Sequence, residues 1–234
     1  MTAIRVLSAG AAKAVVTAVP AGSVGDGTAA IDVDFGPVGA IRERVEAGEA
    51  CDLVVLSRAG IDQLAGGGHV LGETTASIGG VATAIAVARG QALPDIHDVA
   101  GFRAALLAAD AIHFPDAQKS TAGAQFAKVL SGLGLREALG SKLHEHPSGS
   151  VAMRVLAADG GSGIGCTQIT EIIEVDGVEL VGPLPGEYAL TTDYAGAVGS
   201  RAANPELALE LLGILTGEAT LEIRRAAGYE VGAG

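Results

Sequence analysis

Aromatic residues are scarce in this chain, and tryptophan is absent. Among 234 residues, Phe, Tyr and Trp together make up 3%, and the formal net charge is -12. Lys and Arg occur as scattered single residues rather than as a stripe. Proteins that bind nucleic acid use clustered cations for the phosphate backbone and aromatic rings for base stacking. The composition therefore excludes nucleic acid as an expected partner.

Long uninterrupted apolar runs are also missing. Hydrophobic residues make up 49% of the chain and the mean hydropathy is +0.41, yet Gly, Thr or Arg interrupts each apolar stretch well before the roughly 18 residues of a membrane span. We expect no membrane insertion. The opening MTAIRVLSAG lacks the segments of a secretory signal, which predicts a cytoplasmic protein as written. An exported protein in which Met1 replaces a removed signal would look the same and would be periplasmic.

Only two cysteines are present, Cys51 and Cys166, and they lie far apart. This number and spacing favour neither a disulfide framework nor a zinc site, and Cys51 fits a small core residue. The pair His144 and His146 resembles a metal motif, but a third ligand at suitable spacing is missing. The loop after the first strand lacks the G-x-G-x-x-G spacing of a dinucleotide fingerprint. We therefore predict no metal and no cofactor.

Strand and helix patterns alternate through the first third of the chain. Apolar strands are expected at 4–7, 31–35 and 52–56, and a helical pattern follows each one. This alternation is typical of a parallel α/β sheet whose loops at the strand carboxyl ends form the site. A long Gly-broken apolar strand at 78–88, with no helix directly after it, interrupts the alternation.

The remaining two thirds continue with further strands and helices. Helices are expected at 102–109, around 135–143, at 151–159 and 205–215, and in a tail ending at Gly228; strands are expected at 162–168, 178–185 and 188–198.

The segment 111–130, AIHFPDAQKSTAGAQFAKVL, predicts a strand that feeds a helix N-terminus. Ser120 or Thr121 can cap this helix, and the free amides of its first turn, with the positive end of the helix dipole, favour an anion. Lys119 adds a positive charge beside them. The segment is therefore interpreted as a seat for a carboxylate or oxyanion, with an ordinary capped strand-to-helix turn as the alternative.

Several phrases of the sequence resemble one family over nearly the whole chain. These are the first strand with its Ser/Ala/Gly loop, IRERVEAGEACDLVVLSRAGIDQLAGGG, STAGAQFAKVLSGLGL and GSGIGCTQITEI. They resemble bacterial periplasmic solute-binding proteins of the molybdate-binding type. The resemblance implies an α/β, two-lobed type II periplasmic-binding-protein fold with two crossover segments and a central ligand cleft. The lobes would comprise 1–80 plus 190–234 and 81–189.

The match departs from the molybdate pattern at three positions. The resemblance implies serine hydroxyls in the first two loops, where this chain has Ala11 and Val38, and an aromatic hydroxyl where it has Cys166. Molybdate is thus disfavoured. The phrases GCTQITEI and VGPLPGEYALTTDYAGAV are closer to the branch that includes aconitate isomerase, which moves a double bond and a proton within a tricarboxylate.

Two functions follow from these observations. The first is binding and isomerisation of a small polycarboxylate by an allylic proton shift, which requires a base. The base candidates are His113, Glu171 and His146; His113 also fits a core histidine, and Glu171 a surface or orienting residue. The alternative is a non-catalytic solute-binding protein of an ABC transporter, with a permease partner, or a cytoplasmic small-anion sensor.

Both functions require groups that hold a small anion, a di- or tricarboxylate rather than an oxyanion. The expected ligand-binding residues are Ser8, Gly10, Ala11, Gly36, Val38, Gly39, Arg58, Lys119, Ser120, Thr121, Ser148, Gly149, Ser150, Cys166, Thr167 and Gln168.

Overall fold

The structure is a computed structural model that describes residues 2–20 and 22–232. Contacts divide the chain into two compact units. The first unit comprises Met1–Gly80 and Thr192–Gly234, and the second comprises Val81–Thr191. The lobe boundaries expected from the sequence stay a prediction, because a division by contacts does not test whether the two parts move separately.

The first unit is built on a mostly parallel sheet. Its strands are β1 (Ala3–Ala9), β2 (Ala30–Gly36), β3 (Leu53–Ser57) and the part of β9 (Thr191–Val198) that lies in this unit, in the order β2-β1-β3-β9. Strands β1, β2 and β3 are parallel, and β9 is antiparallel to β3. All five residues of β3 are buried, as a central strand requires.

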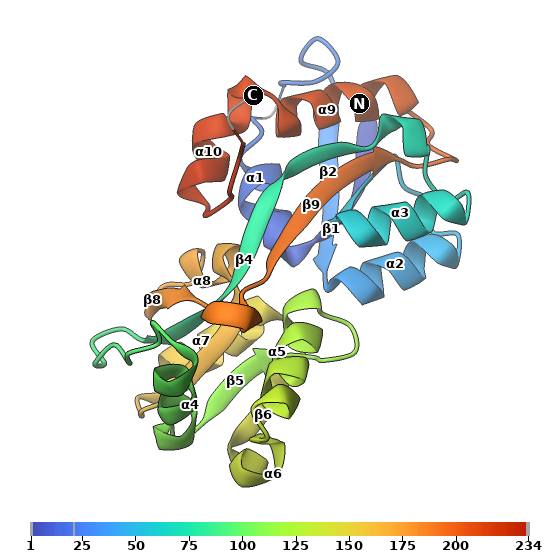
Figure 1. The fold of residues 1–234 in the computed structure, drawn as a ribbon. Coiled ribbons are helices and arrows are strands. Elements are labelled where there is room, and N and C mark those ends of the chain that lie inside the picture. The colour runs from blue at the N-terminus through green and yellow to red at the C-terminus, as the bar shows by residue number, and fades with distance from the viewer. Residues whose placement is uncertain (1, 21, 233–234) are drawn as a thin grey trace. The chain divides into compact units, whose positions relative to one another are not determined.

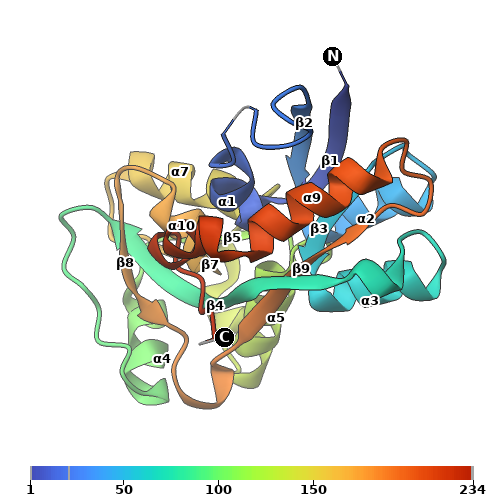
Figure 2. The same ribbon diagram turned by 90° about the horizontal axis from the view of Figure 1, so that it is seen from above.

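Helices cover this sheet and its margins. They are α1 (Lys13–Thr17), α2 (Val38–Glu46), α3 (Arg58–Gly66), α9 (Pro205–Thr216) and α10 (Leu221–Ala226), with 3-10 turns at Gly10–Ala12, Gly72–Thr74 and Glu218–Thr220. Helices α2 and α3 lie side by side against the sheet, α9 packs against β3, and α10 contacts α1 (Figures 1 and 2). The C-terminal segment thereby returns to the start of the chain.

The second unit holds another mixed sheet. Its strands are the later part of β4 (Ala76–Ala88), β5 (Ile112–Pro115), β6 (Leu143–His146), β7 (Ile164–Gln168) and β8 (Val178–Pro183), in the order β8-β4-β7-β5-β6. Strands β5, β6 and β7 are parallel to one another. Strand β4 is antiparallel to β7 and β8.

Helices cover both faces of the second sheet. They are α4 (Val99–Ala108), α5 (Thr121–Gly132), α6 (Arg136–Leu139), α7 (Gly149–Asp159) and α8 (Ile169–Ile173), with 3-10 turns at Gly140–Lys142 and Gly186–Tyr188. One apolar core joins Phe102 of α4 and Phe126 of α5 to Phe114 of β5. A second core joins Met153 of α7 and Ile172 of α8 to β4. The sheet therefore lies between an α4/α5 layer and an α7/α8 layer (Figure 1).

Two sequence predictions were wrong in detail. The helix expected around 135–143 ends after one turn, because Gly140 has φ of 36° and a 3-10 turn at Gly140–Lys142 then leads into β6. The strand expected from Tyr188 begins at Thr191, since the residues before it form a 3-10 turn. The other expected elements are present with shifted ends.

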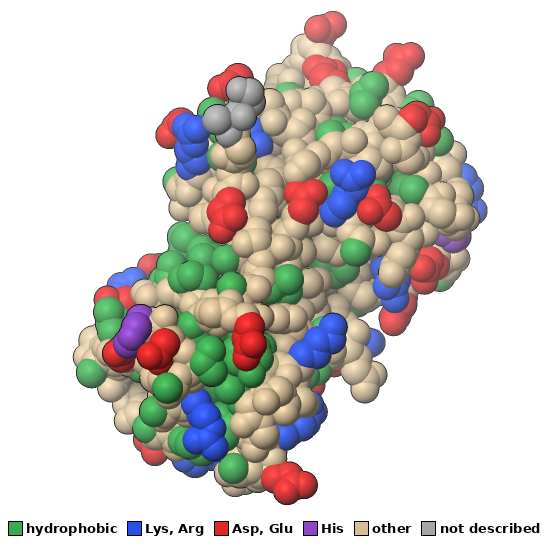
Figure 3. Space-filling model, in the orientation of Figure 1, with side chains coloured by type: hydrophobic (Ala, Val, Ile, Leu, Met, Phe, Trp, Pro, Cys, Tyr) green, Lys and Arg blue, Asp and Glu red, His purple; other side chains and the backbone are tan. Residues whose placement is uncertain are grey.

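The surface carries charges of both signs. On the face shown in Figure 3, Lys and Arg side chains lie among Asp and Glu rather than in a stripe. Within the described residues, no helix is long and apolar enough to cross a membrane.

Candidate functional site

Three parallel strands of the second unit end at one edge of their sheet. Strands β5, β6 and β7 run in the same direction, so the loops that follow them lead into the N-termini of α5, α7 and α8 on the same side. Helix N-termini at such an edge present amides and positive dipole ends. We call this region the carboxyl edge of the second unit; it comprises 115–121, 146–150 and 167–171.

The loop before α5 is folded by its own side chains. Asp116 Oδ1 accepts hydrogen bonds from the backbone N–H groups of Gln118 (2.7 Å) and Lys119 (3.0 Å). Ser120 caps α5 by accepting from Gly123 N at 3.4 Å, as the sequence predicts. A Cβ at position 123 would collide with the carbonyl of Pro115, so glycine permits this close approach of helix to strand.

Two amides of the first turn of α5, those of Thr121 and Ala122, donate no hydrogen bond within the described part of the chain. Ser120 and Thr121 are partly buried, whereas Lys119 is exposed. The α5 N-terminus is therefore a half-satisfied donor set of the kind that binds anions.

The N-terminus of α7 already holds carboxylates of the chain itself. Ser148 caps the helix by accepting from Val151 N at 3.3 Å. Ser150 donates its backbone N–H to Glu171 and its hydroxyl to Glu174 Oε1, at 2.5 Å. A Cβ at position 149 would collide with both Glu171 Oε2 and Thr167 Oγ1. Gly149, Ser150, Thr167 and Glu171 are thus brought together as one packed group.

Burial dominates the chemistry of Glu171, which is 7% exposed. Desolvation raises the pKa of its carboxyl group, and the nearby charge of Glu174 acts in the same direction. Hydrogen bonds from the Thr167 hydroxyl and from the backbone of Ser150 and Gln168 oppose that rise. The result is a carboxyl group with an enhanced tendency to hold a proton.

Two other predicted residues of β7, Cys166 and Gln168, lie in surroundings that differ from those of Thr167. Cys166 is fully buried in the α4/α5 core, and burial raises the pKa of its thiol above the usual range. Gln168 is 2% exposed, and its amide nitrogen can donate to the carbonyls of Val81 and Ala82 at 3.1 and 3.2 Å. Gln168 thereby ties the end of β7 to β4.

Three histidines and an aspartate gather on the α7 face of the sheet. His113 Nδ1 lies 3.0 Å from His146 Nε2, and His113 Nε2 lies 3.0 Å from Asp159 Oδ2. The ring of His144 stacks on His113 with centroids 5.3 Å apart. Burial lowers the pKa of both His113 and His146. No pattern in the sequence predicted Asp159, which is 46 residues from His113.

The four side chains of the histidine group contact one another directly. Within the described residues, no cluster of three or more His, Cys, Asp or Glu side chains is arranged to hold a metal ion. The contacts among the four side chains are hydrogen bonds and ring stacking.

In the first unit, β1, β2 and β3 likewise end at one edge. Ser8 is buried and its hydroxyl donates to Ala9 O at 3.1 Å, while Tyr229 OH donates to Ala11 O at 3.0 Å. Arg58 is exposed and forms an ion pair with Asp62. The sequence analysis missed Ser57, which caps α3 by accepting from Gly60 N. Gly10 begins the 3-10 turn before α1, Gly36 ends β2, and Val38 and Gly39 begin α2; all four are partly buried.

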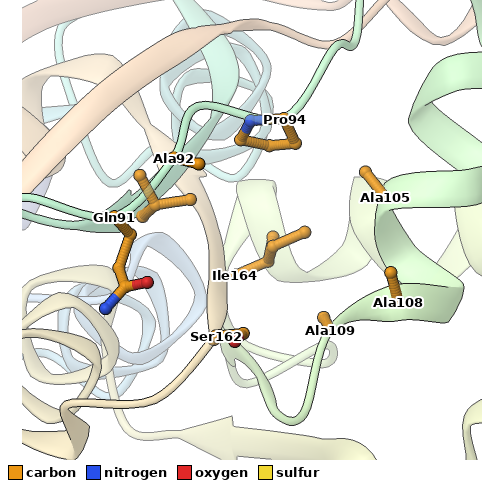
Figure 4. A pocket seen from close by; sticks show the side chains of 10 residues that line it. Gln91, Ala92, Pro94, Ala105, Ala108, Ala109, Ser162 and Ile164 are labelled. Atoms are coloured by element: carbon orange, nitrogen blue, oxygen red, sulfur yellow. The ribbon is translucent and has the colours of Figure 1, made fainter.

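A hollow of about 210 Å³ lies at the opposite edge of the second sheet. Figure 4 shows Ala105 and Ala108 of α4 across it from Ala92 and Pro94, with Ile164 at the amino end of β7 between them. None of the predicted ligand-binding residues lines this hollow. Its walls are mainly apolar, so its chemistry differs from that of an anion seat.

The chain belongs to the bacterial extracellular solute-binding protein family, whose model matches residues 4–230. It is similar in structure to the periplasmic molybdate-binding protein of Azotobacter vinelandii (TM-score 0.80, 18% identity, 98% of this chain and 100% of that one). It is also similar to the sulfate-binding protein SubI of Mycobacterium tuberculosis H37Rv (TM-score 0.77, 18% identity, 98% and 86%). These likenesses confirm the α/β fold of two-lobed periplasmic binding proteins.

A curated relative lies on the branch expected from the sequence. The chain is 28% identical to an aconitate isomerase from a Pseudomonas species over 174 residues, which are 74% of this chain and 64% of that protein. The match thus spans slightly less than two thirds of the relative.

Proposed function

We propose that this protein binds a small polycarboxylate anion, and that the N-terminus of α5 is one of its carboxylate seats. The observation that carries the proposal is the pair of first-turn amides at Thr121 and Ala122 that lack acceptors among the described residues. The Ser120 and Thr121 side chains add hydroxyls, and Lys119 adds a cation. Membership of a solute-binding family, with structural neighbours named for anions, supports an anionic ligand.

Carboxylate rather than molybdate is supported by the first-unit loops. Ala11 and Val38 offer no hydroxyl, and the Ala11 carbonyl is engaged by Tyr229. The Ser150 hydroxyl of the second unit is likewise engaged, by Glu174. A tetrahedral oxyanion would therefore find fewer hydroxyl donors here than the pattern of the molybdate-binding proteins implies.

Calorimetric titration tests the ligand class. We expect citrate or an aconitate isomer to bind the full chain and to raise its thermal unfolding temperature. At a hundredfold excess over the dissociation constant, the bound ligand adds about 3 kcal/mol to the free energy of unfolding. Tight molybdate binding with no response to citrate or aconitate would overturn the proposal.

Isomerisation of the bound ligand is a second candidate function. The 28% identical aconitate isomerase favours it, as do the buried Glu171 carboxyl and the hydrogen-bonded histidine pair, which can hold or move a proton. Proton NMR of a mixture of the chain and cis-aconitate tests it. Appearance of the trans isomer supports catalysis. If the ligand binds and the spectrum does not change, the result supports a non-catalytic receptor.

The receptor alternative has its own support in the family description, which names extracellular solute-binding proteins. Under this alternative the protein works in the periplasm and delivers its anion to an ABC permease. Fractionation of the native host separates the two locations: a periplasmic protein supports the receptor, and a cytoplasmic one supports the sensor or enzyme.

A further inference from the structure

The hydrogen bonds among Asp159, His113 and His146 fix which nitrogen carries each proton. An ionised carboxylate can only accept, so His113 Nε2–H donates to Asp159 Oδ2. A neutral imidazole has one N–H, which leaves His113 Nδ1 as an acceptor for the Nε2–H of His146. The one arrangement that satisfies both contacts with neutral rings leaves Nδ1 of His146 with a free lone pair.

The direction of this chain of contacts follows the sheet. Asp159 ends α7, whereas His113 is the second residue of β5. His146 is the last residue of β6 and pairs in register with Pro115, where β5 ends. Its backbone carbonyl accepts from Asp116 N at 2.7 Å, so the backbone of His146 lies at the strand end beside the α5 loop, while its ring lies on the α7 face against His113. The contacts thus run from the amino side of the sheet to the carboxyl edge.

The burial of the three groups suits proton movement. The His113 side chain is 4% exposed, while that of Asp159 is 47% exposed and His146 is partly buried. A proton taken up at His146 Nδ1 can be followed by transfer of its Nε2 proton to His113, and the positive charge then rests beside Asp159. An ion pair formed in this way offsets the cost of a buried imidazolium. His144, which stacks on His113, is the other titratable ring beside the pair.

We propose that Asp159 and His113 are positioning residues of a proton relay, and that His146 Nδ1 at its open end is the general base for a bound unsaturated polycarboxylate. This inference rests on the proposed carboxylate site. His146 removes a proton from the carbon next to a carboxylate, the electron pair enters the allylic system as the double bond shifts, and the same ring returns the proton to the far carbon. Substrate and product then have the same atoms.

The test follows trans-aconitate in D2O by proton NMR, with calorimetry of the same samples. Wild type is expected to interconvert the isomers and introduce deuterium. His146→Gln is expected to lose about 100-fold or more of the rate, the usual contribution of a general base, while still binding trans-aconitate. Asp159→Asn should lose about tenfold and shift the acidic limb of the pH–rate profile, because the relay no longer ends on a negative charge. The matched control is His97→Gln, which replaces an exposed histidine that is hydrogen-bonded to Asp95. Its rate and its binding of trans-aconitate should equal those of wild type.

The outcomes separate this inference from the proposed function. Binding with an unchanged rate in His146→Gln, or binding without turnover in wild type, overturns the relay and leaves the carboxylate site standing. Absence of trans-aconitate binding overturns the relay, and absence of binding of citrate and of both aconitate isomers overturns the proposed function as well. An independent readout is the 15N–15N coupling across the hydrogen bond between His113 Nδ1 and His146 Nε2. A coupling that is present in wild type and lost in Asp159→Asn supports the relay. Absence of the coupling in wild type overturns it.

Discussion

The hydroxyl of Thr167 donates a hydrogen bond to Glu171 Oε2 across 2.6 Å, and both side chains are buried. The same carboxylate accepts the Ser150 N–H at the start of α7. Glu171 therefore occupies the N-terminus of α7, a position that the sequence analysis assigned to an anionic ligand. The seat that we propose for the ligand is the N-terminus of α5.

Glu171 should make stability decrease with rising pH. Its folded-state pKa is raised above the unfolded value of about 4.5, so the stability it contributes is full below that value and is lost as pH rises through the folded pKa. We expect Glu171→Gln to remove this slope in urea unfolding measured from pH 4.5 to 8. Glu179→Gln on the exposed side of β8 is the control. An identical pH slope in wild type and Glu171→Gln would contradict the assignment.

Gly149→Ala should destabilise the second unit by about 1–3 kcal/mol, because an added Cβ meets Glu171 and Thr167 in a packed group. Gly161→Ala is the matched control, since nothing lies within 4 Å of a Cβ there. Urea unfolding measures both. Equal stability of the two variants would show that the Glu171 carboxyl is free to move away.

The histidine pair should impose the opposite pH dependence. Burial lowers the folded-state pKa of His113 and His146, so the unfolded chain takes up protons first, near its ordinary value of 6.5. Stability is full above that value and is lost as pH falls through it, by about 1.4 kcal/mol for each unit of pKa difference. We expect His113→Gln to flatten the profile between pH 7.5 and 5.

The exposed His97 is the internal comparison for that measurement. A hydrogen bond to Asp95 raises the pKa of its imidazole. His97→Gln should therefore leave the acid loss of stability in place. A profile that changes in His97→Gln and not in His113→Gln would contradict the account.

Local sequence signals predicted much of the fold. Ser120, one of the two predicted caps, caps α5 because a hydroxyl before a helical apolar pattern satisfies a first-turn amide. The alternation of strand and helix in the first third of the chain likewise predicted the parallel strands of the first unit. The family resemblance supplied the two-lobed arrangement, which periodicity alone did not.

Contacts between distant residues could not be predicted in this way. Glu171 meets Ser150, 21 positions earlier, because α8 packs against α7, and His113 meets Asp159 because α7 packs against β5. The alternation of β7 sends Cys166 into the α4/α5 core and Thr167 to the α7 face, a choice that depends on which helix covers which face. The candidate site was thus predicted as a set of loops, whereas its internal hydrogen bonds required the structure.

The central claim, a carboxylate seat at the start of α5, is tested most directly by the double variant Ser120→Ala with Thr121→Ala. Calorimetry with citrate or aconitate should show binding weakened by about 1–3 kcal/mol, because desolvated ligand oxygens lose hydroxyl donors, while loss of the cap costs about 1 kcal/mol of stability. Ser131→Ala, which removes a hydroxyl from the far end of the same helix, should leave affinity unchanged. Unchanged affinity in the double variant, with only the loss of stability, would remove this loop from the site.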